Sequence, residues 1–176
     1  MKNAFWSYSI ALLLASCASS GPGLAPPEVV SHVDVARYIG RWHEIAGFPQ
    51  HFQKGCTDSR ADYRLLDNGK IEVVNSCVRD GKVDTARGKA WVVDKSTNAK
   101  LKVSFFWPFR GDYWIIELGK DYEYAVVSSP NRKYLWILSR TPKMDEALYA
   151  RIVEGLRERG FDVSLLRRTE QGNRKD

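Results

Sequence analysis

The chain has 176 residues, which is the size of a single domain, and its formal net charge is +6. Hydrophobic residues make up 44% and charged residues 27% of the sequence, a balance that excludes an intrinsically disordered chain. Its 13 glycines and 7 prolines exclude a collagen-like or low-complexity chain. A domain of about 150 residues buries roughly 68–70% of its unfolded surface, so we expect neither a metal nor a cofactor.

The first residues are typical of an export signal. Lys2 precedes the mostly apolar residues 4–15, a run too short to span a bilayer, which needs about 20 residues. The segment Leu14-Ala15-Ser16-Cys17 resembles the bacterial lipobox, whose cysteine is acylated and becomes the new N-terminus. We expect removal of residues 1–16 as a signal peptide and a lipid anchor on Cys17. An ordinary signal peptide with a chance cysteine is the alternative.

The residues after Cys17 bear on the location of the protein. Ala18 stands where an Asp would retain such a lipoprotein at the inner membrane, so the resemblance implies the outer membrane, facing the periplasm. Two or three acyl chains suffice for stable anchoring, and residues 17–33 would form the lipidated Cys and a flexible tether. The basic residues are scattered along an exported chain, which favours anionic membrane surfaces as partners and argues against nucleic acid.

The remaining cysteines, Cys56 and Cys77, are an even pair in an exported chain, which favours a disulfide. They flank a hairpin with the turn Asp67-Asn68-Gly69. In a regular two-residue turn at Asn68-Gly69, Cys77 would face Arg60 and not Cys56. A disulfide therefore needs a bulge or a curled approach before the second strand. Two buried free thiols are the alternative.

Short β-rich runs bounded by turn residues occupy the middle of the chain. Because the loops are short, strands adjacent in sequence should pair antiparallel, and eight strands can close without leaving exposed edges. We therefore predict an all-β fold, an eight-stranded up-and-down antiparallel barrel within residues 34–168. The expected strands lie near 41–48, 57–66, 70–78, 86–94, 99–106, 113–119, 123–129 and 134–140.

After the eighth strand the apolar spacing becomes helical, with one stripe formed by Leu148, Tyr149, Ile152, Val153 and Leu156. We expect Thr141 to be the N-cap, Pro142 to occupy the first helical position and Gly160 to end the helix. The helix should pack outside the barrel. A short ninth strand over 161–166 and a polar tail over 169–176 should follow it.

Two motifs resemble those of the lipocalin family. Gly40-Arg41-Trp42-His43-Glu44-Ile45 is similar to the first lipocalin motif, although relatives usually carry Tyr where His43 stands. The segment 134–142 is similar to the third, in which an Arg, here Arg140, ends the last barrel strand. Segments 105–109 and 160–164 resemble bacterial outer-membrane lipocalins, relatives of apolipoprotein D. Only some of these relatives carry the Cys56 and Cys77 pair.

An up-and-down meander distinguishes the two ends of the barrel. Trp42 starts the first strand and Arg140 ends the eighth, so both lie at one end, where a cation–π contact would close the barrel. We assign Gly40, Trp42 and Arg140 to structure. The loops at the other end are 49–56, 79–83, 107–112 and 130–133.

The loop Trp107-Pro108-Phe109-Arg110 places two aromatic residues beside a cation at the open end. It should form either an exposed contact surface or a lid folded over the barrel. In both arrangements Arg110 is a candidate partner for an anionic head group.

The phase of the strands selects the ligand-binding candidates, because alternate residues face the same side. The resemblance adds Tyr63, Tyr113 and Trp136 as inward-facing aromatic residues. For each candidate, ordinary core packing is the alternative. The predicted contacts are Tyr63, Leu101, Val103, Phe105, Tyr113, Ile115, Tyr134, Trp136 and Leu138.

A pocket of this type would bind a fatty acid or lysophospholipid by apolar burial, and would store or ferry it without chemistry. An enzyme is the first alternative, with Glu44 and Glu117 as an inward carboxylate pair, but the sequence lacks the HExxH, GxSxG and P-loop motifs. Binding of a tetrapyrrole near His43 and His51 is the second. The sequence leaves open whether the protein is a monomer or a homodimer.

Overall fold

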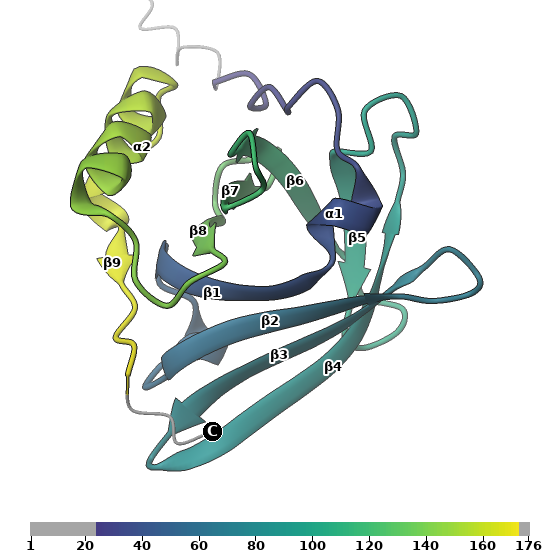
Figure 1. Ribbon diagram of the computed structural model, residues 1–176, viewed down its shortest axis with the longest axis horizontal. Coiled ribbons are helices and arrows are strands. Elements are labelled where there is room, and N and C mark those ends of the chain that lie inside the picture. Colours follow the sequence, from purple (N-terminus) through teal and green to yellow (C-terminus); the bar gives the residue numbers. More distant parts are fainter. Residues whose placement is uncertain (1–23, 173–176) are drawn as a thin grey trace, which may run out of the picture.

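In the computed structural model, which describes residues 24–172, eight antiparallel strands close into a barrel. Each strand pairs with the next along the chain, and β1 also pairs with β8, which closes the sheet (Figure 1). The predicted all-β, up-and-down barrel is therefore confirmed. The strands are β1 (Gly40–Gly47), β2 (Thr57–Leu65), β3 (Ile71–Arg79), β4 (Lys82–Val92), β5 (Lys100–Ser104), β6 (Gly111–Leu118), β7 (Tyr124–Ser128) and β8 (Leu135–Ser139).

Alternation along the strands produces two apolar clusters, one inside the barrel and one outside it. The outer cluster joins β1, β6, β7 and β8 to the helix α2 (Glu146–Glu158), which lies against the outside of the barrel as predicted (Figure 1). Ile152 and Leu156 of α2 are at most 1% exposed. Full burial of one such side chain stabilises the fold by about 1.5–3 kcal/mol.

A β-bulge in β6 changes which side chains face inward. The register against β7 shifts between Ile115 and Glu117, so Ile115 belongs to the inner cluster and Ile116 to the outer one. Glu117 consequently points away from the barrel interior. Arg159 donates a hydrogen bond to its Oε2 at 2.5 Å and Tyr124 to its Oε1 at 3.0 Å. The predicted inward position of Glu117 is therefore wrong.

One end of the barrel is closed by the short helix α1 (Val35–Tyr38) and by Arg140. The Arg140 guanidinium lies 3.8 Å from the centroid of the Trp42 ring, as expected from the strand count. It also donates hydrogen bonds to four backbone carbonyl oxygens, those of Arg37, Tyr38, Arg41 and Tyr122. The indole N–H of the fully buried Trp42 donates to the carbonyl of Tyr38 at 2.8 Å.

The predicted disulfide between Cys56 and Cys77 is present, with a Cα–Cα distance of 5.5 Å. A register shift between Thr57 and Arg60 supplies the bulge that it needs. The turn before β3 is longer than a two-residue turn, because Leu66 N–H donates to the carbonyl of Lys70. For this reason Arg60 faces Ser76 and not Cys77.

The region after β8 differs from the prediction in two details. Asp145, and not Thr141, caps α2, since its side chain accepts a hydrogen bond from Leu148 N–H at 2.9 Å. Thr141 Oγ1 donates instead to the carbonyl of Lys143, which holds the preceding loop. The ninth strand is β9 (Arg167–Arg168), paired with the end of β1, whereas 163–165 form the short 3₁₀ helix η2 (Val163–Leu165).

Both ends of the described chain pack against the barrel. Val30 N–H donates to the carbonyl of Ile115 and Val33 N–H to that of Thr97, and Val33 is 1% exposed. We call residues 24–33 the N-terminal strap. Because its apolar side chains pack on the barrel, the expectation of a flexible tether up to residue 33 is wrong for this part.

The start of the predicted polar tail is also held in place. Thr169 and Gln171 donate hydrogen bonds to Glu44, and Gly172 N–H donates to Asp58. No helix among residues 24–172 is long and apolar enough to cross a membrane. The predicted signal peptide, residues 1–16, and Cys17 lie outside the described residues.

Candidate functional site

The barrel encloses a cavity of about 920 Å³ that opens at the end opposite Arg140. This volume lies near the upper limit of the 300–1,000 Å³ usual for small-molecule sites, so the side chains do not fill the barrel. The lining is mainly apolar and aromatic in the interior, and polar and charged groups gather at the mouth. The cavity can therefore accept a long apolar group while leaving a polar group near solvent.

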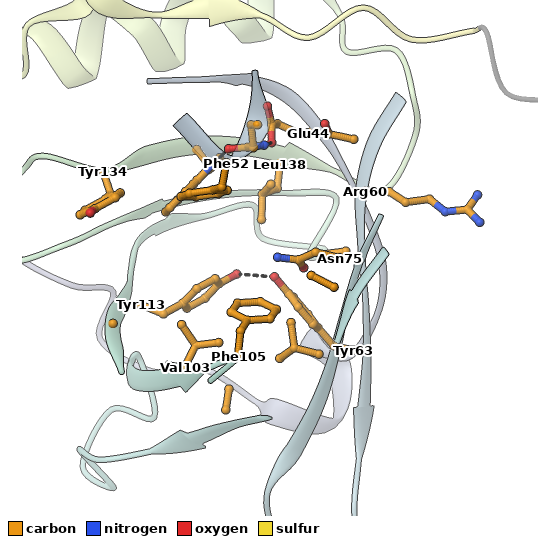
Figure 2. A pocket seen from close by; sticks show the side chains of 18 of the residues that line it. Glu44, Phe52, Arg60, Tyr63, Asn75, Val103, Phe105, Tyr113, Tyr134 and Leu138 are labelled. Carbon is orange, nitrogen blue, oxygen red and sulfur yellow. Dashed lines mark hydrogen bonds between the residues drawn. The ribbon is translucent and has the colours of Figure 1, made fainter. Parts of the chain in front are cut away.

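The structure brings most of the predicted contact residues together around this cavity (Figure 2). Ile115 is the exception: its side chain is fully buried among those of the inner cluster and does not line the cavity. The predicted residues that line the cavity are Tyr63, Leu101, Val103, Phe105, Tyr113, Tyr134, Trp136, Leu138 and Arg110.

Three phenol groups meet at the floor of the cavity, near the closed end. Tyr113 forms hydrogen bonds with the hydroxyl of Tyr38 at 2.7 Å and with that of Tyr63 at 3.2 Å (Figure 2 shows the second). All three tyrosines border the cavity, and the hydrogen bonds between their hydroxyl groups are partly buried. Burial raises the pKa of Tyr63 to about 12 and raises those of Tyr38 and Tyr113 as well. The floor therefore stays neutral at physiological pH and can donate or accept hydrogen bonds.

A polar network crosses the upper wall. The indole N–H of Trp136 donates to Gln53 Oε1 at 3.1 Å, and Gln53 Nε2 donates to Glu44 Oε2 at 2.5 Å. Thr169 Oγ1 donates to the second oxygen of Glu44 at 2.6 Å. Burial raises the pKa of Glu44, and these two hydrogen bonds lower it in part. The network fixes Trp136, the loop after β1 and the C-terminal segment relative to one another.

The mouth is braced on one side by the disulfide. Cys56 and Cys77 both line the cavity and join the loop after β1 to β3. Arg79 strengthens this connection, since its Nη2 donates to the carbonyl of Phe52 at 2.8 Å and lies 3.4 Å from Asp84. The loop that carries Phe52, in the short 3₁₀ helix η1 (His51–Gln53), is thereby held against the strands.

The loop between β5 and β6 forms the opposite side of the mouth. Phe106, Trp107 and Phe109 are 77%, 80% and 76% exposed, so this loop forms an exposed surface and not a lid. Phe106, Phe109 and Arg110 line the entrance. Arg60 is a different case, because its guanidinium points away from the cavity (Figure 2). Of these two arginines, Arg110 is therefore the one available to a ligand head group.

Two glycines lie directly behind aromatic residues of the cavity wall. A Cβ atom on Gly88 would lie 2.6 Å from the carbonyl oxygen of Ser104 and 2.8 Å from the Phe105 ring. A Cβ atom on Gly47 would lie 3.0 Å from the Trp136 ring. Both positions therefore need the absence of a side chain for the aromatic rings to lie where they do.

The residues proposed for the alternative functions are not gathered at this cavity. Glu44 lines it, whereas Glu117 faces α2, so the two carboxyl groups do not form an inward pair. Neither His43 nor His51 belongs to the lining of the cavity. Within residues 24–172 no three His, Cys, Asp or Glu side chains are grouped so as to hold a metal ion.

Several residues that shape the cavity were missed by the strand-phase reasoning. Tyr38 precedes the first strand and reaches the cavity from the short helix α1, which Asp34 caps. On β3, Ile71 and Val73 lie at even spacing from Cys77 and line the cavity with it. An inward position of Cys77 would therefore have predicted inward positions for both residues. Phe52 and Gln53 lie in an irregular loop, where no alternation applies.

The geometry agrees with the comparison to known proteins. A family model described as a lipocalin-like domain matches residues 33–171. Temperature-induced lipocalin-1 of Arabidopsis thaliana is 44% identical over 155 residues, which cover 83% of each chain. The outer membrane lipoprotein Blc of Vibrio cholerae is 39% identical over 158 residues, covering 88% of this chain and 91% of that protein. Apolipoprotein D of Mus musculus is 36% identical over 162 residues, covering 85% and 83%.

Among solved structures, insecticyanin from the tobacco hornworm Manduca sexta matches with a TM-score of 0.68 over 86% of both chains. At 21% identity this likeness concerns the fold alone. The family model spans the whole barrel, and the three relatives share 36–44% of aligned residues over more than four-fifths of the chain. The chain therefore belongs to the lipocalin family, among relatives that include bacterial outer-membrane lipoproteins and apolipoprotein D.

Proposed function

We propose that the protein binds a single-headed amphiphilic lipid, a fatty acid or a lysophospholipid, inside the barrel and stores or transports it. The observation that carries this proposal is the cavity of about 920 Å³, closed at one end and open at the other. Its apolar wall favours an acyl chain, since each buried CH₂ contributes about 0.8 kcal/mol. Arg110 at the mouth suits the anionic head group of such a lipid.

We further propose that the protein works at the bacterial outer membrane, facing the periplasm and anchored through Cys17. Relatives that cover most of the chain are outer membrane lipoproteins, which supports this location. The disulfide between Cys56 and Cys77 is consistent with an oxidising compartment. An anchor would keep the cavity close to the membrane that supplies its ligand.

The ligand would bind by reversible partition, without chemistry. Burial of its chain against Trp136, Phe105 and Leu101 provides the affinity, and the hydroxyl groups at the floor can satisfy a polar atom that reaches them. The ligand leaves intact and no bond is formed or broken. The two His candidates for tetrapyrrole binding lie outside the lining, so the cavity favours a lipid over a His-held tetrapyrrole.

Native mass spectrometry on protein carrying Cys17→Ser, which removes the expected acylation site, tests the proposal. After delipidation, palmitate or a lysophosphatidylethanolamine is added back. We expect a one-to-one adduct of lipid mass that Trp136→Ala weakens and Trp107→Ala does not. A folded protein that takes up neither lipid would contradict the proposed function.

A further inference from the structure

The N-terminal strap determines where the chain leaves the barrel. Its C-terminal residue, Val33, lies beside the closed end, where Val33 N–H donates to the carbonyl of Thr97 in the loop between β4 and β5. Followed toward the N-terminus it passes β6 at Val30 and runs toward α2 (Figure 1). The carbonyl of Ala25 then accepts two hydrogen bonds, at 3.0 and 3.1 Å, from Arg132 in the loop between β7 and β8. This loop borders the mouth of the cavity, so the chain leaves the fold at the open end.

The length of chain beyond the strap limits the orientation of an anchored barrel. Only six residues, 18–23, separate Cys17 from the first residue of the strap, Leu24, so seven Cα–Cα steps join the two. At about 3.6 Å per residue they reach at most about 25 Å. The nine residues of β2, tilted by about 35–45° as in a closed barrel, span roughly 20–25 Å along its axis. An anchor at Cys17 therefore favours the open end near the bilayer, because the closed end could approach it only with a nearly extended tether running along the barrel.

Exposed apolar side chains gather at the same end. Phe106, Trp107 and Phe109 lie on one side of the mouth, and Phe52, which is 62% exposed, lies on the other. Val83, 56% exposed, lies at the adjoining hairpin of β3 and β4. Aromatic residues with this exposure are typical of contact surfaces and are favoured at the interface between lipid and water.

The charge around the mouth is predominantly positive. Exposed cations stand on each of the four open-end loops, namely Lys54, Lys82, Arg110 and Lys133. The acidic residues Asp84 and Asp112 are paired with Arg79 and Lys102. Asp80, at the tip of the same hairpin as Lys82, offsets one of the positive charges. The excess is positive, which complements a surface of anionic phospholipid.

We propose that the open end of the barrel docks on an anionic lipid bilayer through the aromatic side chains of loop 106–109 and Phe52, with Arg110 and the loop lysines facing the head groups. The mouth of the cavity would then open directly onto the membrane. A lipid could pass between bilayer and cavity without crossing water. This surface is additional to the proposed lipid binding, and each can fail without the other.

Sedimentation with vesicles of phosphatidylethanolamine and phosphatidylglycerol tests the docking surface, using protein with Cys17→Ser so that no anchor contributes. The rim variant combines Phe106→Ser, Trp107→Ser and Phe109→Ser. The control variant combines Leu65→Ser and Val93→Ser, two apolar residues exposed by 43% and 50% near the closed end. We expect the rim variant to partition at least about 10-fold more weakly and the control to stay within about 2-fold of the parent.

Arg110→Glu should weaken partition further at low salt, and 0.5 M salt should reduce this charge effect because it screens exposed charges. Equal urea midpoints would show that the variants remain folded. The docking surface would be refuted if the parent protein did not bind the vesicles, or if the rim and control variants lost vesicle binding equally. Self-association through the aromatic loops in place of vesicle binding would also refute it.

Mass spectrometry of the same preparations separates the two proposals. If the parent protein forms the lipid adduct but does not bind vesicles, the docking surface is wrong and lipid binding stands. If the parent protein binds vesicles but forms no lipid adduct, lipid binding in the barrel is wrong, and the aromatic side chains of the open end bind the membrane for another purpose.

Discussion

The two ends of the barrel use the same pair of residue types in opposite ways. At the closed end Trp42 is fully buried and Arg140 lies on its ring, with its donors directed to backbone carbonyls. At the open end Trp107 is 80% exposed and stands near Arg110, which is also exposed. Residue type alone thus does not separate structure from function. What separates the two ends is the number of contacts already present: the side chains of Trp42 and Arg140 are satisfied internally, whereas that of Trp107 is left exposed.

Replacing one tryptophan at each end tests this difference most directly. Trp42→Ala should lower the free energy of unfolding by about 3–5 kcal/mol, since it leaves a cavity in the packed floor. Trp107→Ala should change it by no more than about 0.5 kcal/mol, because the side chain is mostly in water. Urea unfolding monitored by circular dichroism measures both. Similar losses for the two variants would contradict the distinction between the ends.

Loss of the disulfide should lower both the unfolding free energy and the lipid affinity of the open end. Replacing Cys56 and Cys77 by Ser releases a loop with a sequence separation of 21, which should cost about 3 kcal/mol of unfolding free energy. Since the disulfide also holds the loop with Phe52, lipid affinity should fall in the same variant. The parent protein treated with a reductant is the matched control. A double variant as stable as the parent would show that Arg79 alone braces the mouth.

The cavity wall between the two ends should respond in affinity more than in stability. Trp136→Ala removes a large apolar contact in the upper wall, and we expect lipid binding to weaken roughly 10–100-fold, the equivalent of losing about 1.5–3 kcal/mol of burial. Competition with a fluorescent fatty acid measures the change. Trp107→Ala is the control, because this residue does not line the cavity. Unchanged affinity in Trp136→Ala would mean that the chain binds elsewhere.

The phenol groups at the floor give an effect that is visible only at high pH. The pKa of Tyr63 is raised from 10.0 to about 12, so the folded state keeps this proton while the unfolded state loses it. The stabilisation is complete below pH 10 and is lost as the pH rises from 10 through about 12. Unfolding free energies measured across this range should fall less steeply in Tyr63→Phe than in the parent. Parallel slopes would place Tyr63 in contact with water.

The sequence predicts the barrel and much of its inner surface, because alternation on β5 and β8 is regular. It also predicts the contact between Trp42 and Arg140, since an up-and-down meander determines which strand ends meet. Glu117 was placed wrongly because one extra residue in β6 reverses the phase, and a bulge leaves little trace in the pattern of apolar residues.

The remaining errors arise where several local signals compete. Thr141-Pro142 and Asp145 are both acceptable helix starts, and the hydrogen bond of Thr141 within the preceding loop decides between them. Tyr38 could not be assigned to the cavity because a helix of four residues has no periodicity to read. Val33 was assigned to a tether from the Gly- and Pro-rich sequence before it, although its own apolar side chain packs on the barrel.

The glycines at 47 and 88 make the size of the cavity adjustable from behind its wall. Phe105 and Trp136 rest against backbone where a methyl group would push them, and neither glycine needs to touch the ligand to control where these rings stand. A single added carbon at Gly88 would meet the carbonyl oxygen of Ser104 at 2.6 Å as well as the Phe105 ring at 2.8 Å, so both the strand and the ring would have to shift. A substitution at either glycine would therefore change the shape of the cavity without replacing any residue that lines it.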